Sequence, residues 1–237
     1  MYSSSDQSTV IVKPGQSFVA QTFRYNSEYQ KVKRIALEIL TSPPINTICA
    51  DGEIYSYDLK MFHSQIQKHD DRTRTIHWAR IVCLNQLDSN AALTYIRRNW
   101  LKFFWDIFRG IFGFYVCGFH HGDVSLDNIG IRDGSFVLYD YNLSRANRYA
   151  SDDLYRDIYT LFRSLHWRIA REVLCHKEKC LIDTLQYIHT LEEYIEYVRE
   201  EQNFRTNSEA LLFLDALTIQ PYTQANQRDS DDNYPEP

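Results

Sequence analysis

Three oxygen-bearing side chains lie close together in one stretch of the sequence, FHHGDVSLDNIGIRDGSFVLYDYNLSR, which covers residues 119–145. Asp123 and Asn128 are separated by four residues, and Asp140 follows after a run of apolar residues. Carboxylate and amide oxygens can hold Mg²⁺, and a further carboxylate can orient a hydroxyl group and accept its proton. Phosphoryl transfer needs this combination, because it depends on positioning and charge stabilisation. The pattern predicts Asp123 as the catalytic carboxylate, with Asn128 and Asp140 as metal ligands.

The residues between these side chains predict a β-hairpin. The apolar runs NIGI and FVLYD flank the segment RDGS, in which Asp133-Gly134 favours a tight turn. Such a hairpin returns Asp140 to the loop that carries Asp123 and Asn128.

The rest of the pattern predicts a β-rich part followed by a helical part. The predicted strands are TVIVK, EIYSYDLKMF and RTIHWARIVCL, which are rich in β-branched and aromatic residues. The predicted helices, from apolar spacing, are 27–40, 91–119, 153–174, 178–201 and 207–219. We therefore expect an α+β fold with two lobes, joined by a connector near residues 85–90. The predicted division is a disordered start at 1–8, a reduced N-terminal lobe at 9–88, a helical C-terminal lobe at 89–220 and a disordered tail at 221–237.

Composition narrows the class of protein. With 44% hydrophobic residues, the 237-residue chain has enough apolar material for a folded core. Its net charge of -5 disfavours a general nucleic-acid binder. No apolar run reaches the roughly 18 residues of a membrane span. The five scattered cysteines without a secretory leader favour reduced thiols and an intracellular location, cytoplasmic or nuclear.

HGDVSLDN followed by LYDYN resembles the catalytic loop and the metal-binding motif of protein kinase-like enzymes. The segments HWARIVCL, VSLDN and SDDLYRDIYTLFRSL are most similar to those of fungal-type protein kinases. Gly122 also resembles the HGD of the aminoglycoside and choline phosphotransferases. The resemblance extends over residues 10–164 and is strongest over residues 120–161.

The resemblance implies a two-lobed kinase fold with ATP and Mg²⁺ as cofactors. It assigns structural roles to His121, the motif histidine, and to Asp153, the aspartate that a later helix buries under the catalytic loop. It also implies that a strand lysine contacts the phosphates and a helix glutamate holds that lysine. Lys13 in VIVK and Glu28 match these positions. The alternative alignment takes FVAQTF as that strand and places Thr22 at the lysine position.

The sequence departs from the family pattern at three points. It has no Gly-rich loop, because Gly15 is the only glycine before Gly52. Asn142 replaces the glycine of the metal-binding motif, although asparagine tolerates left-handed backbone. Only twelve residues separate Asp140 from Asp153, too few for the usual peptide-docking segment.

These features leave three hypotheses open. The first is an ATP-dependent kinase that phosphorylates a Ser/Thr hydroxyl of a protein. The second is a pseudokinase, a nucleotide-binding interaction module that docks a partner protein on its helical lobe. A small-molecule kinase of the aminoglycoside or choline phosphotransferase type is a variant of the first hypothesis. The third is an unrelated helical protein that matches the motif by chance.

Overall fold

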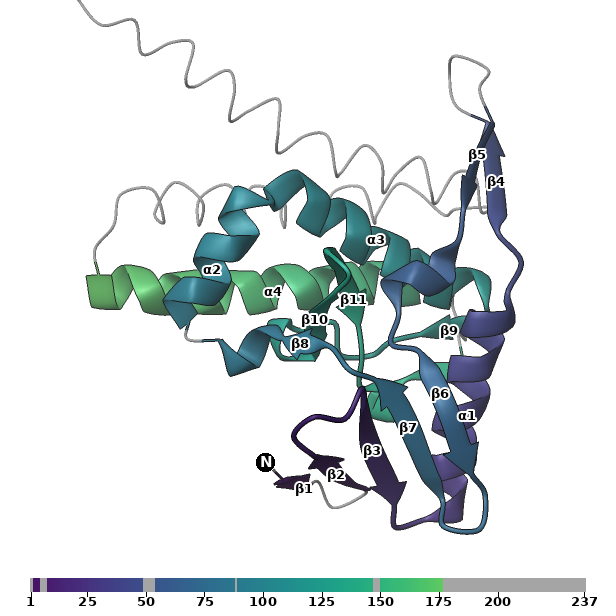
Figure 1. The fold of residues 1–237 in the computed structure, drawn as a ribbon. Helices are drawn as coiled ribbons and strands as arrows, with labels where there is room; N and C mark the ends of the chain where they lie inside the picture. Colours follow the sequence, from purple (N-terminus) through teal and green to yellow (C-terminus); the bar gives the residue numbers. More distant parts are fainter. Residues whose placement is uncertain (1, 5–7, 49–53, 88, 147–149, 177–237) are drawn as a thin grey trace, which may run out of the picture.

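The computed structural model describes residues 2–4, 8–48, 54–87, 89–146 and 150–176, which form a mixed α+β fold (Figure 1). The strands are β1 (Tyr2–Ser4), β2 (Ser8–Val12), β3 (Phe18–Phe23), β4 (Ile45–Ile48), β5 (Ile54–Tyr57), β6 (Ile66–Asp70), β7 (Thr75–Ala79), β8 (Val82–Cys83), β9 (Phe119–His120), β10 (Ile129–Arg132), β11 (Ser135–Leu138) and β12 (Arg145–Ala146). The helices are α1 (Asn26–Thr41), α2 (Ser89–Arg98), α3 (Trp100–Val116) and α4 (Ala150–His176), with short 3-10 helices η1 (Leu59–Phe62), η2 (Leu84–Gln86), η3 (Leu126–Asn128) and η4 (Tyr141–Leu143). Within these ranges, no helix combines the length and apolar character that a membrane crossing requires.

An antiparallel five-stranded sheet contains most of the N-terminal strands, in the order β1-β2-β3-β7-β6. Residues 2–4 form β1 where the sequence predicted an unstructured start. The predicted strand VIVK is β2, but it does not lead into the helix. FVAQTF forms β3, which directly precedes α1. The strand directly before the helix is therefore FVAQTF and not VIVK.

Helix α1 packs beside this sheet, as the spacing of its apolar residues predicted. One face is buried and contributes Tyr29, Val32, Ile35, Ala36 and Ile39. The helix ends at Thr41, immediately before Ser42 and two prolines, which disfavour helical continuation. Beyond it, β4 and β5 form a hairpin that projects away from the rest of the described structure (Figure 1).

The helix predicted over residues 91–119 is two helices, so its predicted continuity is wrong. Asn99 separates α2 from α3 with φ -124° and ψ 30°. Its Nδ2 donates a hydrogen bond to the carbonyl oxygen of Tyr95 at 2.8 Å. Asparagine side chains compete for backbone groups in this way and so favour helix ends over helix interiors.

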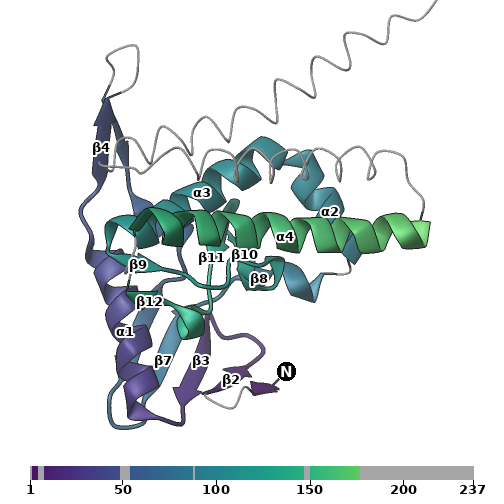
Figure 2. The ribbon, with the colours of Figure 1, turned by 180° about the vertical axis from the view of Figure 1, so that it is seen from behind.

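Helices α3 and α4 lie side by side (Figures 1 and 2). Helix α3 packs against the short strands β9 and β11, and α4 packs against β9. The predicted hairpin is confirmed as β10 and β11, and β8 extends it to three strands. At its turn, Asp133 and Gly134 both have positive φ, 51° and 78°, as a type I′ turn requires. A continuous core runs from Phe23 in the five-stranded sheet to Leu165 in α4. The predicted helices 178–201 and 207–219 and the predicted tail 221–237 lie outside the described residues.

Candidate active site

The loop that follows α3 is tied at both ends to later parts of the chain. Strand β9 pairs with β12, so that His120 lies opposite Arg145. The Ser144 hydroxyl donates a hydrogen bond to the buried carbonyl oxygen of His121 at 3.0 Å. These contacts hold the segment after Asp140 against the loop that carries Asp123.

Asp157 on α4 holds the loop in place through two hydrogen bonds. Its buried carboxylate accepts hydrogen bonds from the backbone N–H groups of His121, at 2.7 Å, and Gly122, at 2.9 Å. Burial raises the pKa of Asp157 to about 7, although the two N–H groups oppose this rise. The prediction that Asp153 has this role is wrong. Asp153 lies one helical turn earlier and is only partly buried, whereas Asp157 is 1% exposed.

His121 connects the loop to the strand end before Asp140. Its Nε2 donates to the carbonyl oxygen of Tyr139 at 3.0 Å, and its Nδ1 accepts from the N–H of Asp123 at 3.3 Å. Complete burial lowers the pKa of His121 to about 4, so the ring is neutral at pH 7. These contacts agree with the structural role predicted for His121.

Asn128 fixes the orientation of Asp123. Its Nδ2 donates to Asp123 Oδ2 at 2.7 Å and to the Asp123 carbonyl oxygen at 3.0 Å. Asn128 is 8% exposed, and Asp123 is partly exposed. Because the amide nitrogen faces Asp123, Oδ1 is the Asn128 atom available to a cation.

The hairpin returns Asp140 to this loop, as predicted. The Tyr139 N–H donates to the carbonyl oxygen of Asn128 at 3.0 Å. Asp140 has left-handed backbone, φ 64° and ψ 78°, and its carboxylate accepts from the N–H of Asn142 at 3.3 Å. The sequence indicated left-handed backbone at Asn142, but the structure has it at Asp140.

Asp140 is exposed, but partial desolvation by the protein atoms near its carboxyl group raises the pKa of that group, and the negative charge of Asp123 adds to this rise. The structure thus brings Asp123, Asn128 and Asp140 together. Among the described residues, no group of three or more His, Cys, Asp or Glu side chains could hold a metal ion. The predicted metal ligands are one carboxylate, Asp140, and one amide oxygen, from Asn128. This small set fits Mg²⁺, because this ion takes few protein oxygens and keeps several waters.

Lys13 and Glu28 do not form the predicted ion pair. Lys13 is exposed in the turn after β2. Strand β3 follows this turn in the chain, so Lys13 does not lie on the strand that leads into α1. Glu28 instead pairs with Lys31 one turn along α1, at 2.7 Å. Lys31 Nζ also donates to the Asn142 carbonyl oxygen at 2.8 Å, next to the Asp140 turn. This contact of Lys31 with the Asp140 turn was not predicted from the sequence.

Gln21 is a second residue that the sequence analysis missed. Its side chain is buried on β3, accepts from Trp78 Nε1 at 2.9 Å and donates to Ser8 Oγ at 3.0 Å and Asn142 Oδ1 at 3.4 Å. Thr22, which the alternative alignment placed at the lysine position, instead contacts Thr75 at 3.0 Å. The sequence contained a signal that the Gln21 side chain is buried, because strand alternation places it on the same face as the buried Phe23.

Gly122 has a structural explanation. It has φ +84°, and a Cβ atom there would lie 2.7 Å from the Leu143 carbonyl oxygen. Only glycine fits this position without strain. The glycine in HGD therefore follows from local packing, so it gives no information about the substrate.

No protein-family model matches this chain, and no curated protein matches it in sequence.

Proposed function

We propose that this chain is an ATP- and Mg²⁺-dependent phosphotransferase of the protein kinase-like fold, acting on a Ser/Thr hydroxyl. The observation that carries the proposal is the convergence of Asp123, Asn128 and Asp140 at the end of the β10–β11 hairpin. Two of the three are carboxylates whose charges disfavour each other, and a bound cation would relieve that repulsion.

In this proposal, Asp123 positions the attacking hydroxyl and accepts its proton. The contact from Asn128 holds the Asp123 carboxylate in place before the substrate arrives, so little ordering is left for the reaction. The hydroxyl oxygen forms a bond to the γ-phosphorus while the bond to the bridging oxygen breaks, and ADP leaves. Asn128 and Asp140 would hold Mg²⁺, which when bound neutralises phosphate charge. Lys31 would add a cation from α1.

The test of this proposal is phosphate transfer from labelled ATP to hydroxyl-bearing acceptors. Asp123→Asn keeps the side-chain shape and removes the base, so transfer should fall about 10²–10⁴-fold. The matched control is Asp133→Asn, a change of the same kind at an exposed residue of the β10–β11 turn. Equal transfer by wild type and Asp123→Asn would contradict the proposal.

A binding module that holds a nucleotide without turning it over is the second candidate. It is favoured by β3, whose contact with the Asp140 turn comes from the neutral Gln21 rather than from a cation. In addition, residues 5–7, which join β1 to β2, contain no glycine. Such a module would bind Mg²⁺ and nucleotide but transfer no phosphate in the assay above.

A further inference from the structure

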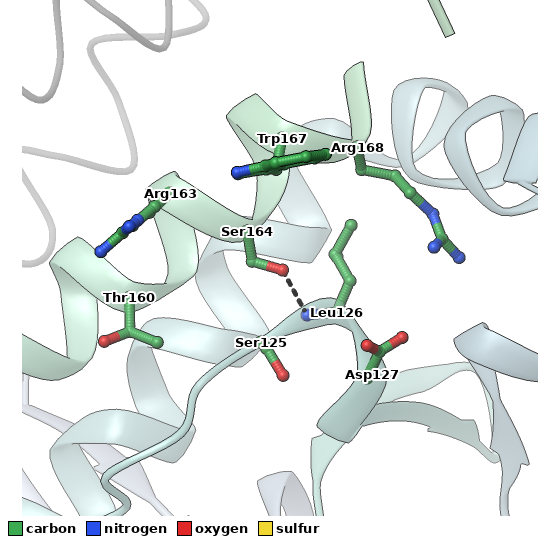
Figure 3. A pocket seen from close by; sticks show the side chains of 8 residues that line it. All are labelled: Ser125, Leu126, Asp127, Thr160, Arg163, Ser164, Trp167 and Arg168. Carbon is green, nitrogen blue, oxygen red and sulfur yellow. Dashed lines mark hydrogen bonds between the residues drawn. The ribbon is translucent and has the colours of Figure 1, made fainter. Parts of the chain in front are cut away.

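A hollow of about 320 Å³ lies between the loop after Asp123 and the middle of α4 (Figure 3). Its loop side consists of Ser125, Leu126 and Asp127. Since each residue of chain spans at most about 3.6 Å, Ser125 lies within about 7 Å of Asp123. The hollow therefore begins two residues along the loop from the proposed catalytic aspartate.

The α4 side of this hollow carries two arginines without ion-pair partners among the described residues. Arg163 is exposed, and its guanidinium makes no hydrogen bond or ion pair there. Arg168 is partly buried, and its Nε is a buried donor without a hydrogen-bond partner. With Asp127 as its only carboxylate, the lining carries a net positive charge.

Between the two arginines the surface is apolar and firmly supported. Trp167 is 65% exposed, an unusual position for an indole on a helix. Ser164 Oγ accepts a hydrogen bond from the Leu126 N–H at 2.9 Å, which ties the loop to α4. Figure 3 shows Arg163 and Arg168 pointing in opposite directions on either side of this contact. Tryptophan and arginine are the residues most enriched at the energetic centres of protein interfaces.

The placement of these cations suits a peptide with acidic side chains. The two arginines lie on either side of the contact between Ser164 and Leu126 (Figure 3), so a peptide segment that crosses this contact could bring acidic groups to both. The hollow is open to solvent, and an open site fits one face of a peptide better than a free small molecule, which pockets usually enclose.

We propose that this hollow binds an acidic segment of a peptide acceptor and so places a neighbouring Ser or Thr hydroxyl at Asp123. The inference rests on the proposed function, because it assigns the acceptor side of the same site. Arg163 and Arg168 recognise the acidic groups, and Trp167 supplies apolar contact area.

The experiment measures binding of labelled peptides to the full chain without nucleotide, so that it does not depend on catalysis. Serine peptides of one length carry either alanine or aspartate at alternate positions near the serine. The acidic peptide should bind at least tenfold more tightly. Arg163→Ala and Arg168→Ala should each reduce this preference, and the double variant should abolish it. The matched control, Arg72→Ala, removes an exposed arginine from the turn between β6 and β7 and should change nothing.

A charge-reversal variant distinguishes loss of recognition from loss of the fold. Arg163→Glu with Arg168→Glu should prefer lysine-containing peptides, whereas an unfolded variant would prefer neither. Phosphoserine in place of aspartate, with inorganic phosphate as competitor, shows whether phosphate or carboxylate is preferred. Equal binding of acidic and neutral peptides by wild type, or an acidic preference that survives the double substitution, would overturn the inference. Peptide binding without phosphate transfer would leave this inference standing and contradict the proposed function, whereas transfer without acidic preference would do the reverse.

Discussion

The loop that carries Asp123 and the sheet that contacts the Asp140 turn are held in place in different ways. The loop rests on buried contacts, in which Asp157 accepts two backbone N–H groups and His121 joins the loop to the strand end before Asp140. On the sheet side, the contacts to the Asp140 turn come from Gln21 and from a partly exposed Lys31. The difference suggests that the carboxylates are preorganised, whereas the proposed phosphate contacts depend on how α1 and β3 sit over them.

The largest expected effect comes from removing the Asp157 carboxylate that holds the loop. Asp157→Ala leaves two buried N–H groups without an acceptor, and each orphaned group costs about 1–3 kcal/mol, so the free energy of unfolding should fall by about 2–6 kcal/mol. Denaturant unfolding measures this change. Asp153→Ala, one turn away and partly buried, is the matched control and should cost much less. A larger loss at Asp153 than at Asp157 would reinstate the sequence-based assignment.

A smaller effect should distinguish the two lysines. Lys31 lies beside the Asp140 turn and Lys13 does not, so Lys31→Ala should weaken nucleotide binding about tenfold, which corresponds to about 1.4 kcal/mol. Lys13→Ala should leave the affinity unchanged. Isothermal titration with Mg²⁺ and nucleotide measures both. If only Lys13→Ala weakened binding, the role proposed for Lys31 would be wrong.

The smallest effect is on pH dependence. The raised pKa of Asp140 means that the folded protein takes up a proton there at a higher pH than an ordinary aspartate does. Since the proton and Mg²⁺ compete for this carboxylate, Mg²⁺ affinity should fall as pH is lowered through the raised pKa. Asp140→Asn should lose both the affinity and this acid-side dependence, while Asp127→Asn should keep them. An Mg²⁺ affinity that did not change on the acid side would count against Asp140 as a ligand.

The parts of the site that depend on residues close together in the chain were predicted correctly. Asp123 and Asn128 share one loop, and the turn Asp133-Gly134 imposes the hairpin that returns Asp140. Each of these steps depends on residues close in sequence, so turn chemistry and spacing were enough to predict the convergence.

The features that depend on tertiary packing were not predicted correctly. Asp153 and Asp157 are one turn apart on the same face of α4, so helical periodicity alone cannot choose between them. The prediction of Lys13 rested on the position of Glu28 at the start of the helix, but β3 rather than β2 leads into α1. The three-residue β1 gives no pattern of its own, because only pairing with β2 defines it.

The measurement that tests the central claim most directly is calorimetric titration of the full chain with adenine nucleotide, with and without Mg²⁺. The account predicts nucleotide binding that requires Mg²⁺ and is lost in Asp140→Asn while the variant stays folded. Binding that is equally strong without Mg²⁺ or in Asp140→Asn, or no binding at millimolar concentrations, would contradict it.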